Sequence, residues 1–107
     1  AIPVIIFLFL LAVSPYFADK TPPSFNNTCP GNMVVYTPEC SSTALVNWSE
    51  PTATDNSGHL TIDHPLIRPP IDLIIGLHNI LYSAFDSSGN RVNCTFIVQI
   101  ASMFLVL

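Results

Sequence analysis

The stretch ILYSAFDSSGNRVNCTFIVQI, residues 80–100, decides the fold of this chain. In an extended strand, residues two apart lie on the same face. The residues that we expect to point inward are Ile80, Tyr82, Ala84, Cys94, Phe96, Val98 and Ile100. The opposed faces carry Leu81, Ser83, Phe85, Thr95, Ile97 and Gln99. This alternation is typical of strands with one buried face, so the stretch predicts a β-hairpin.

The loop of this hairpin, Asp86–Asn90 (DSSGN), is too long for a two-residue turn and contains residues that favour a defined conformation. Asp and Ser side chains bond backbone N–H groups two or three residues further along. Gly89 can take a positive φ without steric cost, and Asn90 tolerates one. An earlier segment, Asp55–Gly58 (DNSG), has the same composition. We predict structural turns at both places, formed by Asp55, Gly58, Asp86, Gly89 and Asn90.

Short β-prone segments precede the hairpin and are separated by Pro and Gly. They are Asn32–Thr37, Thr43–Ser49, Leu60–Ile62 and Ile71–Ile75. Prolines between the last two segments exclude a long helix there. Strand signals about every 10 residues, with no helical pattern in 19–101, predict an all-β protein built as a β-sandwich. Trp48 and Tyr82 lie on inward faces, where we expect core aromatics.

The two ends of the chain differ from this pattern. Ile2–Val13 is an apolar run of about 12 residues, short of the roughly 20 that span a bilayer. Its length suits the hydrophobic region of a signal peptide, and the alternative is a remnant of preceding sequence. Two prolines in Asp19–Pro23 then interrupt any regular element. We therefore divide the chain into an apolar segment (1–18), a β-sandwich module (19–101) and an apolar tail (102–107).

Charge and composition narrow the function classes. The 107 residues are enough for one domain and not two. The net charge is −4, and the cations Lys20, Arg68 and Arg91 are scattered along the chain. A phosphate backbone is bound by clustered Lys and Arg, so we exclude nucleic-acid binding. A polybasic membrane patch is excluded for the same reason.

Metal-binding and catalytic patterns are weak. The two turns offer oxygens to calcium, but calcium takes six to eight oxygens and the EF-hand spacing is absent. The set His59, Asp63, His64 and His78 lacks a ligand spacing such as HExxH, so we expect surface histidines. No GxSxG elbow is present, and Cys40 lacks any supporting signature. We predict no catalytic residue, no cofactor and no metal.

Cysteines and sequons favour a secreted context. A Cys29–Cys94 bridge would tie the start of the module to its end. The residues alone leave Cys29–Cys40, Cys40–Cys94 and three free thiols open as alternatives. Sequons at Asn26, Asn47 and Asn93 are candidate N-glycosylation sites.

Seven pieces in order resemble the hyalin repeat (HYR) family. They are DKTPP (19–23), CP (29–30), VNW (46–48), EPTATDNSG (50–58), IG (75–76), YSAFDSSGN (82–90) and CTFIV (94–98). The resemblance covers about 80 residues, from 19 to 101, and implies an immunoglobulin-like β-sandwich of about seven short antiparallel strands. It maps the family's cysteine pair onto Cys29 and Cys94, whereas Cys40 departs from the pattern. The family has no known catalytic residues.

The resemblance also implies a setting and a role. HYR modules usually stand beside sushi and EGF-like repeats in larger adhesion or matrix proteins. We therefore expect an extracellular interaction module, in a secreted or cell-surface protein, that contributes to cell adhesion or matrix assembly. Its expected partners are other extracellular or cell-surface proteins and neighbouring modules of its own chain, with no nucleic acid and no small-molecule substrate. The alternative is a ligand-binding ectodomain module of a receptor or complement-like regulator.

Overall fold

The computed structural model describes residues 21–103, and its longest element is the expected hairpin. Strands β5 (Gly76–Asp86) and β6 (Arg91–Ala101) pair antiparallel from Gly76↔Ile100 to Phe85↔Arg91. Between Asn93 and Ile100, β6 alternates strictly between exposed and buried residues. The inward set predicted from the sequence is therefore confirmed along both strands.

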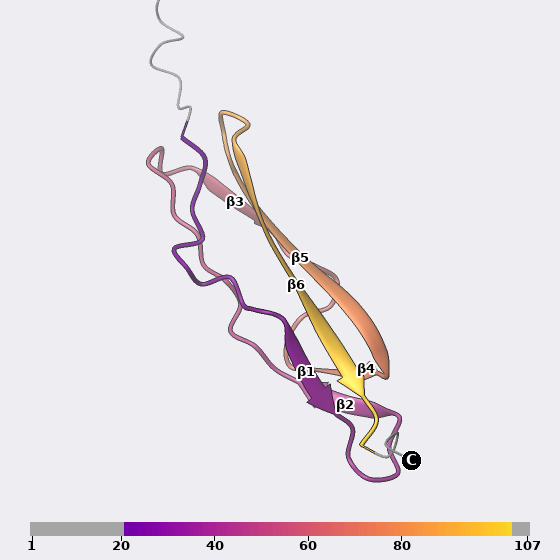
Figure 1. Cartoon of the computed structure of the whole chain (residues 1–107). Helices are drawn as coiled ribbons and strands as arrows, with labels where there is room; N and C mark the ends of the chain where they lie inside the picture. Colours follow the sequence, from indigo (N-terminus) through magenta and orange to yellow (C-terminus); the bar gives the residue numbers. More distant parts are fainter. Residues whose placement is uncertain (1–20, 104–107) are drawn as a thin grey trace, which may run out of the picture.

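Four shorter strands complete the fold, and the described part contains no helix. They are β1 (Met33–Tyr36), β2 (Thr43–Val46), β3 (Leu60–Asp63) and β4 (Ile71–Ile74). One sheet has the order β1-β6-β5-β3, and the other pairs β2 with β4 (Figure 1). Within residues 21–103, no helix is long and apolar enough to cross a membrane. The predicted all-β sandwich is confirmed.

Two details differ from the expected set of about seven antiparallel strands. The described residues form six strands, because β2 ends at Val46 and the following chain makes only an isolated bridge, Ser24↔Thr54. In addition, β1 runs parallel to β6, from Met33↔Val98 to Tyr36↔Ala101. Parallel neighbours need a long crossover, and nearly the whole domain lies between these two strands. Patterns of neighbouring residues in the sequence therefore could not predict that β1 pairs with β6.

The core lies between the two sheets. The small sheet contributes Ala44, Val46 and Leu73, and the chain after β2 adds Trp48. These residues face the inward side chains of β5 and β6. The Trp48 ring meets Phe96 edge-on at 5.5 Å between centroids. Aromatic pairs of this geometry contribute beyond the area that they bury, so Phe96 helps to hold the sheets together.

Ser83 is an exception to the alternation. It lies on the outward-facing side of β5 but is only 4% exposed. Strand β3 pairs beside it through Asp63↔Ser83, and its hydroxyl donates a hydrogen bond of 2.8 Å to Asn93 Oδ1. Strand β3 therefore covers Ser83 on one side, and Asn93 of β6 bonds it on the other.

The hairpin loop is organised by one carboxylate. Asp86, 3% exposed, accepts the backbone N–H of Ser88 at 3.0 Å and that of Asn90 at 2.9 Å on Oδ1. Its Oδ2 accepts the Asn90 side-chain amide at 3.0 Å. The positive φ falls on Gly89, at 89°, where a β-carbon would be strained. The Asp86 side chain thus supplies hydrogen bonds that the turn backbone cannot make with itself.

The Asp55 turn follows the same scheme. The Ser57 backbone N–H donates to Asp55 Oδ2 at 3.1 Å, and the Ser57 hydroxyl also bonds that oxygen. Gly58 takes φ 76°. Both turns therefore use an Asp carboxylate to bond the backbone two residues on, with Gly at the left-handed position.

A disulfide joins Cys29 to Cys94, with 5.6 Å between the α-carbons. Cys94 is 2% exposed on the inner face of β6, and Cys29 lies in the segment before β1. Cys40 is a free, exposed thiol at φ 60° in the turn between β1 and β2. The predicted segment 1–18 and positions 104–107 of the tail lie outside the described residues.

Replacing Cys29 and Cys94 together by Ala should destabilise the domain. The bridge closes a loop with a sequence separation of 65 residues. By chain entropy a loop of that length stabilises by about 4 kcal/mol, so we expect a loss of roughly 2–4 kcal/mol in urea unfolding. Cys40→Ser is the matched control, and its change should stay within about 0.5 kcal/mol. A comparable loss in the control would contradict the assignment of the stabilising pair.

Candidate functional site

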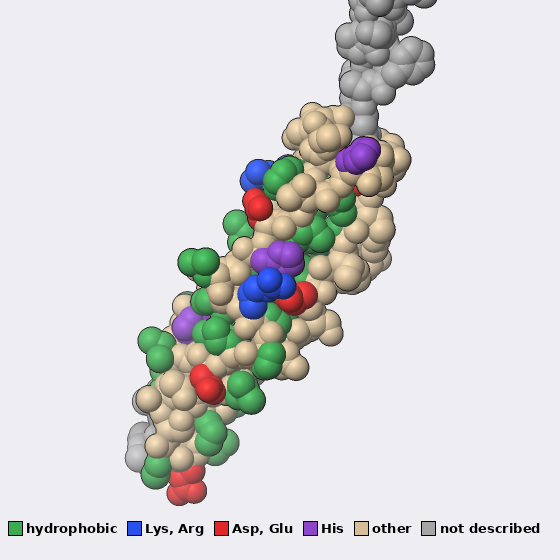
Figure 2. All heavy atoms as spheres, turned by 180° about the vertical axis from the view of Figure 1, so that it is seen from behind, with side chains coloured by type: hydrophobic (Ala, Val, Ile, Leu, Met, Phe, Trp, Pro, Cys, Tyr) green, Lys and Arg blue, Asp and Glu red, His purple; other side chains and the backbone are tan. Residues whose placement is uncertain are grey.

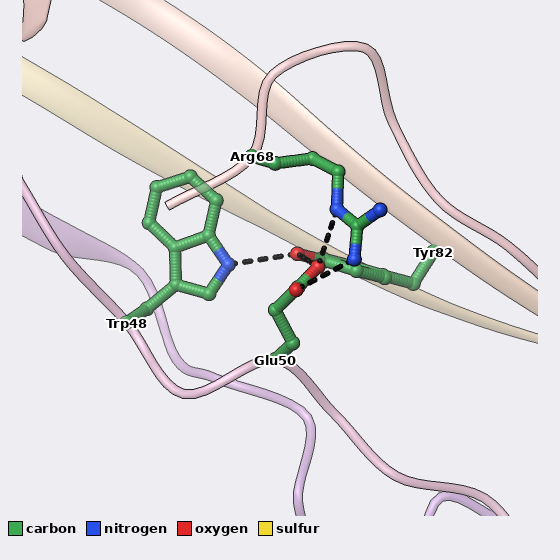
Figure 3. Close-up of polar contacts among 4 residues, drawn as sticks. All are labelled: Trp48, Glu50, Arg68 and Tyr82. Carbon is green, nitrogen blue, oxygen red and sulfur yellow. Dashed lines mark hydrogen bonds and ion pairs between the residues drawn. The ribbon is translucent and has the colours of Figure 1, made fainter. Parts of the chain in front are cut away.

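Four polar side chains form a cluster where the two sheets meet (Figure 3). Trp48 Nε1–H donates to the Tyr82 hydroxyl at 2.9 Å, and that hydroxyl donates to Glu50 Oε2 at 2.8 Å. Arg68 holds the same carboxylate in a fork, with Nε at 3.0 Å from Oε2 and Nη2 at 2.8 Å from Oε1. The cluster therefore links strand β5 to the chain after β2 and to the β3–β4 connection.

Charge and burial set the protonation of this cluster. Hydrogen bonding from Arg68 holds the pKa of Glu50 below its usual value. Glu50 in turn raises the pKa of Arg68. Burial raises the pKa of Tyr82, so its hydroxyl keeps its proton at neutral pH and can donate it to Glu50. The result is a chain of oriented hydrogen bonds that ends in an exposed ion pair.

The cluster has the character of a structural link. Tyr82 is fully buried, at 0% exposure, so its hydroxyl cannot meet a substrate. The His64 ring packs edge-on against the Tyr82 ring at 5.8 Å, and the Phe96 ring stacks on it at 6.4 Å. The Glu50–Arg68 pair was missed from the sequence, because 18 residues separate its members and no motif joins them.

The histidines do not form a site. His59 and His64 are exposed, and the half-buried His78 places Nε2 2.8 Å from the Ile74 carbonyl oxygen. Histidine side chains form separate patches along the face in Figure 2. Among residues 21–103, no group of three or more His, Cys, Asp and Glu side chains could hold a metal ion.

The three sequons lie at the surface. Asn26 is exposed, and its amide bonds Thr54 Oγ1 at 3.0 Å. Asn47 is exposed just after β2. Asn93 is exposed on β6 and accepts the hydrogen bond from Ser83. Glycosylation at these three positions stays a prediction.

The large sheet presents exposed apolar side chains to solvent. We call them the outer apolar face, and they are Val34, Tyr36, Leu77, Leu81 and Ile97, between 37% and 68% exposed.

Uncharged polar residues separate these apolar side chains. They are Asn32, Asn79, Thr95 and Gln99. A shallow hollow of about 530 Å³ is lined by Asn32, Asn79 and Thr95 together with Leu81 and Ile97. Exposed apolar side chains grouped on one face of a sheet mark a candidate site of protein contact. The alternation had already placed Leu81 and Ile97 outward, but grouping them with Val34 and Tyr36 required the β1–β6 pairing.

The HYR domain family matches residues 18–100 of this sequence. The chain belongs to the HYR domain family. As an HYR domain it is an extracellular module, in a secreted protein or in the ectodomain of a cell-surface protein.

Two named relatives support this membership. The HYR domain is 41% identical over 75 residues to "Sushi, von Willebrand factor type A, EGF and pentraxin domain-containing protein 1" of Mus musculus, covering 68% of this chain and 2% of that protein. It is 36% identical over 86 residues to hyalin of Strongylocentrotus purpuratus, covering 79% of this chain and 7% of hyalin. The chain therefore spans a small part of each relative's length. No solved structure matches it.

Tyr82→Phe tests the link between the sheets. The ring stays in the core, but the buried Trp48 N–H loses its acceptor, and an unpaired buried donor costs about 1–3 kcal/mol. We expect urea unfolding to show a loss of that size. Tyr36→Phe is the matched control, because Tyr36 is 58% exposed and its hydroxyl is solvated. Equal losses in the two variants would contradict the proposed role of the Tyr82 hydroxyl.

Glu50→Gln tests the pH dependence of the ion pair. A carboxylate whose folded pKa is lowered adds stability that is present above its unfolded pKa and lost as the pH falls through the folded pKa. The stability difference between wild type and Glu50→Gln should therefore be largest near neutral pH and shrink below the usual value of 4.5. Urea unfolding across this range measures it. In Arg68→Gln, the loss of stability on acidification should be smaller than in the wild type. A loss of the same size would show that Arg68 is not its cause.

Proposed function

We propose that this HYR domain is a structural and interaction module that contributes to cell adhesion or matrix assembly within a larger, multi-domain protein. The observation that carries the proposal is the outer apolar face, which is solvent-exposed on a sheet tied by the Cys29–Cys94 bridge. A rigid sheet with apolar side chains can bury surface against a partner at a low cost in conformational entropy.

The proposed partners are other extracellular or cell-surface proteins, together with neighbouring modules of the same chain. The small share of each relative that the chain spans supports the second group, because an HYR domain in such proteins has long stretches of chain beside it. The proposed module covers residues 19–101. One relative's name gives several kinds of domain, the other's is hyalin, and neither name denotes an enzyme, which supports a role without catalysis.

A bead-adhesion assay tests this function. Beads coated with the full chain are expected to bind cells and cell-derived matrix, and soluble chain should compete. Ile97→Lys places a charge in the middle of the outer apolar face and should reduce binding about tenfold. Leu45→Lys is the matched control, since Leu45 is 66% exposed on the other sheet and should leave binding unchanged.

Two results would overturn the proposal. One is the absence of binding by the folded, disulfide-bonded wild type to any cell or matrix preparation. The other is an equal loss in Ile97→Lys and Leu45→Lys, which would place the contact elsewhere. Competition by a soluble small ligand in place of protein would favour the receptor-type module.

A further inference from the structure

One edge of β5 carries unpaired backbone groups. Strand β3 covers only the end of β5, pairing Leu60–Asp63 with Ser83–Asp86. From Gly76 to Tyr82, β5 pairs with β6 on its other side, and no described strand pairs with its free edge. Such an edge is a template for a further strand, because its N–H and C=O groups point into solvent in the sheet plane.

The described chain after β3 makes no backbone pairing with this edge. It crosses to the small sheet, where Arg68 is held by Glu50. On the way Leu66 is fully exposed, at 103%, so it does not pack against β5. No backbone hydrogen bond joins the described residues 64–70 to β5. From this segment, Ile67 packs against the core and the His64 ring packs on Tyr82, at the very end of the free stretch.

The free edge also lacks the usual protection against pairing. Natural edges are blunted by charged side chains, prolines or bulges. The stretch Gly76–Tyr82 (GLHNILY) contains no Asp, Glu, Lys, Arg or Pro. Its outward side chains are Leu77, Asn79 and Leu81, and all three are exposed. An acidic chain with net charge −4 thus presents an uncharged, half-apolar edge.

We propose that the occupant of this edge is a second copy of the chain, paired antiparallel through its own β5. A two-fold axis at Asn79 sets Leu77 opposite Leu81 of the second copy, and Gly76 opposite Tyr82 of the second copy. This register uses the whole free stretch, because β3 blocks β5 beyond Tyr82 and the strand begins at Gly76. The contact is isologous, as in most dimers, because each copy contributes the same edge. Two copies therefore use up both edges, and no third copy can add to the contact.

Charge favours a second copy over a charged peptide. Two acidic chains repel unless their contact excludes like charges, and this edge brings none together. A basic or acidic segment would find no opposite charge on β5 with which to pair. The Leu77–Leu81 cross-strand pairs would bury apolar surface on both sides of the axis, which stabilises antiparallel strands. The paired copies would form one continuous sheet and place their outer apolar faces side by side.

The inference deepens the proposed function, on which it rests, by naming a partner. Sedimentation velocity of the full chain over a range of concentrations is expected to show a monomer–dimer equilibrium.

Asn79→Lys sets two cations against each other at the axis and should weaken dimerisation at least about tenfold. Thr95→Lys is the matched control: Thr95 is exposed on the same face but lies on β6, away from the edge. It should dimerise as the wild type does.

Amide hydrogen exchange supplies a readout of the backbone itself. Amides between Leu77 and Leu81 should exchange more slowly as the concentration rises, because strand addition protects them. A chain that stays monomeric at all concentrations overturns the inference, and so does loss of the dimer in Thr95→Lys but not in Asn79→Lys. A monomer that still binds cells on beads overturns this inference alone. A dimer that binds neither cells nor matrix overturns the adhesion function instead.

Discussion

The Asp86 carboxylate sets the register on which the rest of the sandwich depends. By bonding the amides of Ser88 and Asn90 it fixes where β5 ends and β6 begins. A slip of one residue would turn every side chain of a strand to the opposite face. In the observed register Tyr82 stands opposite Cys94, and both point into the core. The disulfide and the aromatic core both follow from this alignment.

The sheets are then joined by two kinds of contact. Apolar side chains pack between them, and the hydroxyl of Tyr82 ties the Trp48 indole to Glu50. Apolar packing alone is tolerant of sliding, whereas hydrogen bonds have narrow geometric limits. The cluster therefore defines the relative position of the sheets. Its position, half inside the core and half at the surface, lets Arg68 neutralise the carboxylate without a buried charge.

The sequence allowed the local features to be predicted and left the long-range ones open. Alternation over residues 80–100 predicted the hairpin, because period-2 burial leaves its mark on every residue of a long strand. The Asp86 turn was readable for a similar reason, since its partners lie within four residues. The pairing of Cys29 with Cys94 came from the family resemblance, as spacing alone could not choose among the cysteines. The β1–β6 pairing and the Glu50–Arg68 contact depend on how the chain crosses between sheets.

The position of the disulfide has a mechanical consequence. When the two ends of the domain are pulled apart, the force is applied to the chain before Cys29 and after Ala101. The covalent bond passes the load directly from Cys29 to Cys94, so the chain between these two cysteines cannot be pulled out. Only the short segments outside the bridge can lengthen. A protein with such modules in series would transmit force with little extension, and the edge of β5 would keep its shape under load.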